Sequence, residues 1–181
     1  MSRVGKHPVS IPANVQVTIQ EGNVLVKGPL GSLESDVIRF VNNDLTKEKL
    51  TMTPLSDNPK DRAKWGMAKR IIDNMVEGVV KGYSQTIEII GVGFKVAQES
   101  PKELRFSLGY SHDIVFELPE GITFVIEKPT VLVIKGIDKQ KVGQIVGEII
   151  RLRRRDPYKG KGLYRIAPVV EYRRSKEGKK K

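Results

Sequence analysis

Two stretches of this sequence have the apolar spacing of long amphipathic helices, and a run of short strand-like stretches precedes each of them. One of these strand-like stretches, EGNVLVKG at residues 21–28, is similar to KPTVLVIKG at residues 128–136, with one residue inserted. Two valine-rich strands can look alike by chance, but the shared layout favours a duplication. Strands followed by one helix, twice, predict an α+β fold of two similar small domains. Each domain would be an antiparallel β-sheet packed against one long helix.

The first helix is expected between residues 57 and 82. Either Asp57 or Asn58 can cap it, Pro59 suits its first turn, and Gly82 is a natural stop. The apolar face that this spacing predicts consists of Ala68, Ile71, Ile72, Met75, Val76 and Val79.

The second helix is expected to begin after its cap, Asp138. Gly143 and Gly147 lie one turn apart on it, which predicts that a strand or sheet approaches the helix closely there. The apolar face of this helix consists of Val142, Ile145, Val146, Ile149 and Leu152.

Large apolar side chains elsewhere in these elements are most simply explained as core residues. On the first helix they are Trp65, Met67 and Met75, and in strand-like stretches they are Phe94, Phe106 and Phe116.

Positive charge is concentrated at one end of the chain. The net charge is +11, yet residues 151–181 alone hold thirteen lysines and arginines against three acidic residues, a net of +10. Residues 1–150 hold nineteen basic and eighteen acidic residues, a net of +1. A nearly neutral body with a basic end predicts a polyanionic partner or an anionic membrane surface. We therefore expect an N-terminal domain at residues 1–82, a C-terminal domain at 83–155 and a basic tail at 156–181.

The cellular compartment is indicated by what the sequence lacks. It has no cysteine, which excludes disulfide bonds and thiolate metal sites. The first ten residues, MSRVGKHPVS, lack the apolar core of a secretory signal. No apolar stretch approaches the roughly 20 residues of a membrane-spanning helix. We therefore expect a soluble, intracellular protein.

No arrangement of residues suggests catalysis, a metal or a cofactor. Of the two histidines, His7 lies near the N-terminus and His112 lies in a Ser-His-Asp stretch at 111–113 that is more simply a turn than a catalytic set. The glycine stretches GVGFK at 91–95 and GKG at 160–162 match neither a phosphate-binding loop nor a dinucleotide-binding turn, and the former is more simply a tight turn between strands. We predict a protein that is not an enzyme and that has no metal, cofactor or small-molecule substrate.

The most basic stretch, RRRDPYKGKGLYR at residues 153–165, combines residue types that suit a nucleic-acid backbone. Glycines let a backbone approach a phosphate chain, lysines carry mobile charge, and arginines present planar forks to phosphates or base edges. Tyr158 and Tyr164 can stack on unpaired bases. Pro157 ends any helix that enters the stretch.

A solubility tail or a membrane-binding segment would account less well for this stretch. A solubility tail would suit residues 176–181, but it has no need of arginine, tyrosine, glycine and proline together. A membrane-binding segment would need an apolar face, which this stretch lacks. Nucleic acid is therefore the favoured partner. RNA is preferred to DNA because the sequence has no helix-turn-helix, zinc finger or basic zipper.

A series of motifs links these features to a known family. In chain order they are MSRVGKHPV at 1–9, VKGPLG at 26–31, GVGFK at 91–95, SLGYSH at 107–112, LPEGI at 118–122, GIDKQKVGQ at 136–144 and DPYKGKGL at 156–163. In this order the motifs closely resemble the bacterial-type large-subunit ribosomal protein six family over almost the whole chain. One departure is Arg155, where the family often has proline.

The resemblance implies two duplicated α+β domains and binding to large-subunit ribosomal RNA near the sarcin–ricin loop. That position lies by the base of the acidic stalk, where translational GTPases dock. The expected partners are this RNA, neighbouring ribosomal proteins at the stalk base and translational GTPases, in cytoplasmic ribosomes. The alternative is a free RNA-binding or RNA-chaperone protein outside the ribosome.

The RNA-binding residues that we expect come from two sources. By the resemblance, contacts are expected from Tyr158, Lys159, Gly160, Lys161 and Gly162. By charge and stacking capacity alone, further contacts are expected from Arg151, Arg153, Arg154, Arg155, Tyr164, Arg165, Arg173, Arg174 and Lys176. His112 lies in a family motif without an assigned role.

Overall fold

The computed structural model describes residues 5–20, 22–46, 49–56 and 58–166. These residues form two compact units. The first unit runs to Tyr83 and also includes Ile137–Lys139, and the second unit consists of Ser84–Gly136 and the chain from Gln140 onward. The fold is α+β, with antiparallel sheets and two α-helices among the described residues.

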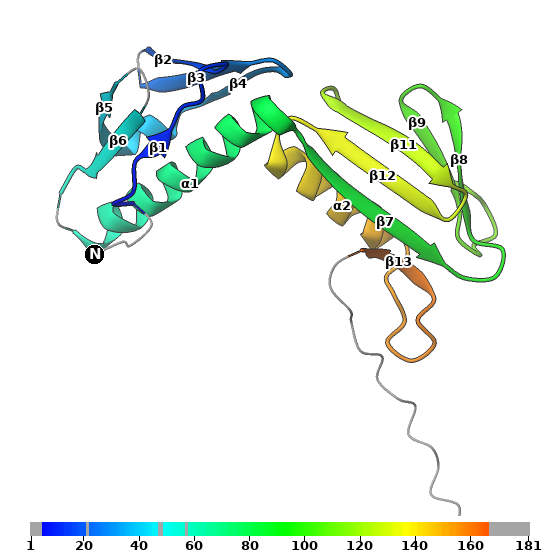
Figure 1. The fold of residues 1–181 in the computed structure, drawn as a ribbon. Coiled ribbons are helices and arrows are strands. Elements are labelled where there is room, and N and C mark those ends of the chain that lie inside the picture. The colour runs from blue at the N-terminus through cyan, green and yellow to red at the C-terminus, as the bar shows by residue number, and fades with distance from the viewer. Residues whose placement is uncertain (1–4, 21, 47–48, 57, 167–181) are drawn as a thin grey trace, which may run out of the picture. The chain divides into compact units, whose positions relative to one another are not determined.

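In the first unit, a long helix packs against two three-stranded sheets with the strand orders β1-β6-β5 and β2-β3-β4 (Figure 1). The elements are β1 (Val9–Ser10), β2 (Gln16–Gln20), β3 (Asn23–Gly28), β4 (Gly31–Ser35), a 3-10 helix (Val37–Phe40), β5 (Val41–Leu45), β6 (Lys49–Pro54) and α1 (Pro59–Lys81). All neighbouring strands in these two sheets are antiparallel.

The helix α1 begins and ends as its sequence predicts. Asn58 occupies the N-cap position before Pro59, and Gly82 ends the helix with a φ of 71°. The predicted apolar face is confirmed, with Ile71 partly buried and the other five residues buried. Trp65 is a core residue, and its indole nitrogen donates a hydrogen bond to the Met52 carbonyl oxygen at 2.8 Å. The prediction was wrong for Met67, which is 46% exposed and lies at the edge of the buried face, one turn before the partly buried Ile71.

The second unit contains a three-stranded sheet, β10-β9-β8, and a four-stranded sheet, β11-β12-β7-β13 (Figure 1). The elements are β7 (Tyr83–Ile90), β8 (Lys95–Ser100), β9 (Glu103–Ser107), β10 (Ile114–Glu117), β11 (Ile122–Lys128), β12 (Val131–Gly136), α2 (Lys139–Leu152) and β13 (Gly162–Arg165). Of the phenylalanines expected in the core, Phe106 is fully buried and the other two are half-buried.

The helix α2 starts directly after Asp138, as predicted, and buries Val142, Ile145, Val146 and Ile149. The expected close approach at Gly143 and Gly147 is wrong. A Cβ at either position would meet nothing within 4 Å outside its own helix turn, because these glycines lie off the buried face.

The two similar sequence stretches occupy equivalent places in their units. Both form interior strands, β3 and β12, and both end in a glycine. A Cβ at Gly28 would lie 2.7 Å from Val79 of α1, and a Cβ at Gly136 would lie 2.8 Å from Val142 of α2. In both units the end of the interior strand therefore packs directly on a valine of the helix.

The structure differs from the predicted architecture in one respect. Each unit has two sheets, whereas the prediction had a single sheet per domain. Alternating apolar residues identify strands, but the choice of partner depends on contacts that are distant in the sequence.

Candidate nucleic-acid interface

The basic stretch after α2 is partly built into the four-stranded sheet. Its last part forms β13, which runs antiparallel to β7 with Leu163 opposite Ile89 and Tyr164 opposite Glu88. Leu163 is fully buried. Residues up to Ile166 thus belong to the second unit, whereas the predicted tail began at residue 156. A signal for this strand exists in the sequence: Leu163 and Tyr164 follow Gly162, shortly after a stretch that contains Pro157 and Gly160.

The turn before β13 is a closed loop, residues 156–161, which we call the basic loop. The Asp156 backbone nitrogen donates to the Lys161 carbonyl oxygen at 2.8 Å, and the Gly160 nitrogen donates to the Asp156 carbonyl oxygen at 2.9 Å. The Asp156 carboxylate accepts hydrogen bonds from the backbone nitrogens of Tyr158 at 2.9 Å and Lys159 at 3.2 Å. The side chain of one acidic residue therefore fixes the backbone of the loop. The side chains of Lys159 and Lys161 take no part in these hydrogen bonds.

The side chains at the tip of the basic loop face solvent. Tyr158 is 62% exposed, and Lys159 and Lys161 are also exposed. Arg151, Arg154 and Arg165 are exposed in the flanking segments, and Arg165 donates a hydrogen bond to the Gln85 side chain at 3.1 Å. Six of the residues that were predicted to bind RNA are thus exposed on the surface of the second unit, where their side chains are accessible to phosphates.

The two glycines of the stretch are buried and have structural roles. Gly160 has a φ of 69° and Gly162 a φ of 134°, values that favour glycine. A Cβ at Gly162 would lie 2.7 Å from the Arg154 carbonyl oxygen and from the Arg155 Cα. Gly162 therefore packs against the backbone of Arg154 and Arg155. Contact of the two glycines with RNA stays a prediction.

Arg153 and Arg155 are half-buried against aromatic rings. The Arg153 guanidinium lies 4.8 Å from the centre of the Tyr110 ring and 5.9 Å from that of Phe94. The Arg155 guanidinium lies 5.0 Å from the centre of the Tyr164 ring. Sequence reasoning missed these contacts because Phe94 and Tyr110 come from distant loops. The remaining predicted residues, Arg173, Arg174 and Lys176, lie outside the described residues.

The charge of the described part of the stretch is strongly positive. Residues 151–166 hold seven arginines and lysines and one acidic residue, Asp156. The carboxylate of that residue already accepts two backbone hydrogen bonds. Clustered cations on an ordered protein backbone attract a chain of phosphates, and this surface has both features.

His112 shows no catalytic arrangement. It is exposed in the turn between β9 and β10, where the Ser107 hydroxyl donates to the Asp113 carboxylate at 2.8 Å. Within residues 5–20, 22–46, 49–56 and 58–166, no three His, Cys, Asp or Glu side chains are grouped to hold a metal ion. Within the same residues, no helix is both long enough and apolar enough to cross a membrane.

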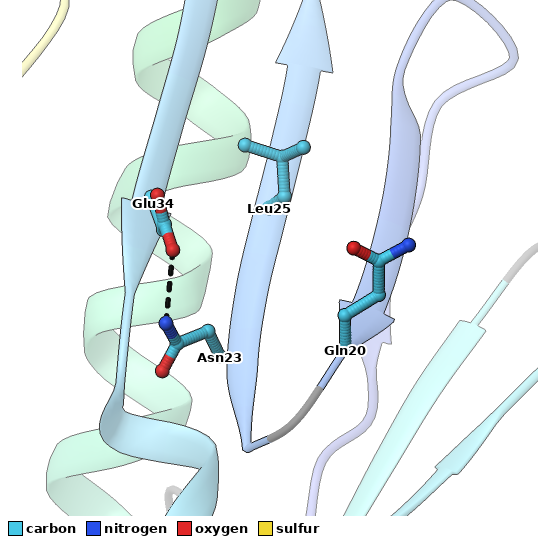
Figure 2. Close-up of a pocket in the computed structure, with 4 residues that line it drawn as sticks. All are labelled: Gln20, Asn23, Leu25 and Glu34. Atoms are coloured by element: carbon cyan, nitrogen blue, oxygen red, sulfur yellow. Dashed lines mark hydrogen bonds between the residues drawn. The ribbon is translucent and has the colours of Figure 1, made fainter.

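A separate hollow lies on the β2-β3-β4 sheet of the first unit and has a volume of about 550 Å³ (Figure 2). It is lined by Gln20, Asn23, Leu25 and Glu34. The Asn23 side-chain nitrogen donates to the Glu34 carboxylate at 2.9 Å, and the Arg39 guanidinium donates to the Asn23 side-chain oxygen at 3.0 Å. Among the described residues that line it, Glu34 is the one charged side chain and its charge is negative, so this hollow does not suit a polyanion.

One tyrosine of the first unit has a strongly shifted pKa. Burial raises the pKa of Tyr83 to about 12, with further contributions from the hydrogen bond and charge of Glu77 and from the charge of Asp73. The Tyr83 hydroxyl lies 3.0 Å from the Asn74 carbonyl oxygen and 3.1 Å from a Glu77 carboxylate oxygen. Tyr83 therefore keeps its proton above pH 10, where an unperturbed tyrosine loses it, and its hydroxyl remains a hydrogen-bond donor near the end of α1.

Comparison with known proteins gives a consistent result over the whole chain. The family described as Ribosomal protein L6 matches residues 11–82 and 90–164. The chain is 47% identical to the large ribosomal subunit protein uL6 of Zymomonas mobilis, over 100% of both chains. It is 44% identical to the proteins of the same name from Azorhizobium caulinodans and Xanthobacter autotrophicus, again over 100% of both chains. The chain therefore belongs to the ribosomal protein L6 family.

Proposed function

We propose that this protein is a structural component of the large ribosomal subunit and that it binds large-subunit ribosomal RNA through the basic loop and its flanks. Relatives that match the chain over its full length are named as large-subunit proteins. The observation that carries the proposal is the basic loop itself, whose backbone is closed by its own hydrogen bonds while Tyr158, Lys159 and Lys161 point into solvent.

The proposed mechanism is placement of charge. The second unit holds the basic loop rigid, so Lys159 and Lys161 meet phosphates without a large loss of backbone entropy. Tyr158 offers a ring on which an unpaired base can stack. Arg151, Arg154 and Arg165 extend the positive surface on either side of the loop. The protein would thereby fix how neighbouring RNA helices pack.

The location that we propose within the subunit is more specific. We place the basic loop near the sarcin–ricin loop and the base of the stalk, in cytoplasmic ribosomes. There it would support the site used by translational GTPases and would adjoin other ribosomal proteins. This part of the proposal rests on the resemblance of the DPYKGKGL motif at residues 156–163.

The family is one of structural, non-enzymatic proteins, in agreement with the prediction that the chain is not an enzyme. The alternative to a ribosomal role is a free RNA-binding or RNA-chaperone protein. The two differ in their expected behaviour on sedimentation. A subunit component stays with large subunits through a high-salt wash, whereas a free RNA-binding protein is released.

The test of RNA binding compares two double variants of the full chain. The probe is a transcribed large-subunit RNA fragment that contains the sarcin–ricin loop, and binding is measured across a salt series. The slope of log K against log salt is negative, and each phosphate contact adds about 0.7–0.9 to its magnitude. Lys159→Gln with Lys161→Gln should therefore reduce that magnitude by about 1.5. Lys27→Gln with Lys49→Gln removes two exposed lysines from strands of the first unit and should leave the slope unchanged. Equal slopes for the two double variants would contradict the proposal.

A further inference from the structure

Three consecutive arginines, Arg153–Arg155, leave the end of α2 and point in different directions. The Leu163 backbone nitrogen donates to the Arg153 carbonyl oxygen at 2.9 Å, and Arg154 forms a parallel bridge with Leu163. Arg154 is exposed, while Arg153 and Arg155 on either side of it are half-buried.

Arg153 joins two loops to the end of α2. Its guanidinium lies near the rings of both Phe94, in the turn after β7, and Tyr110, in the turn after β9. A planar guanidinium can stack on an aromatic face in a way that a lysine ammonium cannot reproduce. The Tyr110 hydroxyl also donates to the Leu152 carbonyl oxygen at 3.0 Å. That bond satisfies one of the carbonyl groups left without a partner at a helix C-terminus, where the positive Arg153 is also favoured.

The Phe94 ring that supports Arg153 is itself held by glycines. A Cβ at Gly91 would collide with this ring, and a Cβ at Gly109 would lie 2.8 Å from it. Gly109 also has a φ of 74°. The GVGFK and SLGYSH motifs therefore meet at the Phe94 ring, and the Arg153 guanidinium lies near the same ring.

Arg155, which directly precedes the basic loop, performs a similar role across the base of the loop. Its guanidinium lies over the Tyr164 ring, and the Tyr164 hydroxyl donates to the Glu88 carboxylate at 2.6 Å. This series of contacts connects the start of the loop to β13 and then to β7. The basic loop is thus held at its entrance by Arg153 and across its base by Arg155.

We propose that Arg153 and Arg155 are positioning residues that orient the basic loop, and that Arg154 is the arginine of the three that contacts phosphate. The second half of this inference rests on the proposed RNA-binding function. The first half depends only on the packing inside the second unit and can be tested without RNA.

The test uses charge-conserving and charge-removing variants of the full chain. Arg153→Lys and Arg154→Lys keep the charge, whereas Arg153→Gln and Arg154→Gln remove it. Without RNA, hydrogen exchange by mass spectrometry reports the order of residues 156–161. Exchange there should become faster in both Arg153 variants and should be unchanged in both Arg154 variants. Arg155→Lys should also accelerate exchange in residues 156–161.

The same variants are then compared in binding to the RNA fragment across a salt series. Arg154→Gln should lower the salt slope by about 0.7–0.9, and Arg154→Lys should bind like the unchanged protein. Both Arg153 variants should bind about tenfold more weakly with an unchanged slope, because they loosen the loop without removing a phosphate contact.

Two results would overturn the inference. If Arg153→Lys behaves like the unchanged protein while Arg153→Gln lowers the slope as much as Arg154→Gln, then Arg153 contacts phosphate directly. If hydrogen exchange in residues 156–161 does not respond to either Arg153 variant, then Arg153 does not position the loop. Absence of salt-dependent binding by the unchanged protein would refute the proposed function instead, and the exchange data would still decide the positioning role.

Discussion

Replacement of Gly162 by alanine tests how tightly the basic loop is tied to its sheet. The φ of this residue is 134°, a conformation that a residue with a side chain adopts at a cost of about 1–3 kcal/mol. The new Cβ would also lie 2.7 Å from the Arg154 carbonyl oxygen and 2.8 Å from the Arg155 nitrogen. These obstacles are backbone atoms that cannot rotate away, so overpacking adds about 1–3 kcal/mol. We expect Gly162→Ala to lower the free energy of unfolding of the second unit by about 4 kcal/mol.

Two other glycines of the second unit separate the contributions to this effect. Gly121 has a φ of 84°, but a Cβ there would meet nothing within 4 Å. Gly121→Ala should therefore show strain alone, about 1–2 kcal/mol. Gly143 lies inside α2 with open space around it, so Gly143→Ala should stabilise the second unit by about 1 kcal/mol.

The assay combines two spectroscopic signals during denaturation in urea. Far-ultraviolet circular dichroism follows both units, whereas fluorescence follows Trp65, the single tryptophan, which lies in the core of the first unit. The circular dichroism transition should shift in Gly162→Ala more than in Gly121→Ala. If the two variants lose the same free energy, the close packing of Gly162 on the Arg154–Arg155 backbone does not contribute, and the reasoning is refuted.

Two further predictions concern the first unit. Gly28→Ala places a Cβ 2.7 Å from the Val79 side chain and 2.9 Å from its carbonyl oxygen. It should therefore lower the free energy of unfolding of the first unit by about 2 kcal/mol, measured by Trp65 fluorescence in urea. An unchanged urea midpoint would contradict this packing. Because the pKa of Tyr83 is about 12 in the folded protein against 10.0 for the unperturbed side chain, its stabilising effect is complete below pH 10 and is lost as the pH rises towards 12. Unfolding midpoints across this range should fall more steeply for the unchanged protein than for Tyr83→Phe, and parallel curves would show that Tyr83 is not the responsible group.

The features of this fold that the sequence predicts are those that depend on neighbouring residues. Both ends of α1 and the start of α2 follow from local chemistry at Pro59, Gly82 and Asp138. Close contacts between elements do not follow in this way. Sequence spacing pointed to Gly143 and Gly147 of α2, but a close neighbour is found at Gly78 of α1, where a Cβ would collide with the Ile137 carbonyl oxygen.

The residues of the candidate interface likewise fall into those whose environment the sequence predicts and those whose environment it does not. The exposure of Tyr158, Lys159 and Lys161 follows from a charged loop with a proline and glycines, and the sequence predicted it. The stacking of Arg153 and Arg155 does not follow, because charge alone treats all arginines alike. Which arginine is stacked depends on rings that the folded chain brings from other loops.

The pairing of β13 with β7 has a consequence for the order in which the chain can fold during its synthesis. β7 is the first strand of the four-stranded sheet to be made, and β13 is the last. Until Gly162–Arg165 has been synthesised, one edge of β7 has no strand beside it, and Ile89 lacks its neighbour Leu163. An open edge of this kind can pair with another chain, and long-range pairing of this kind is slow to form. The nascent second unit therefore cannot complete its sheet before the basic loop has been made.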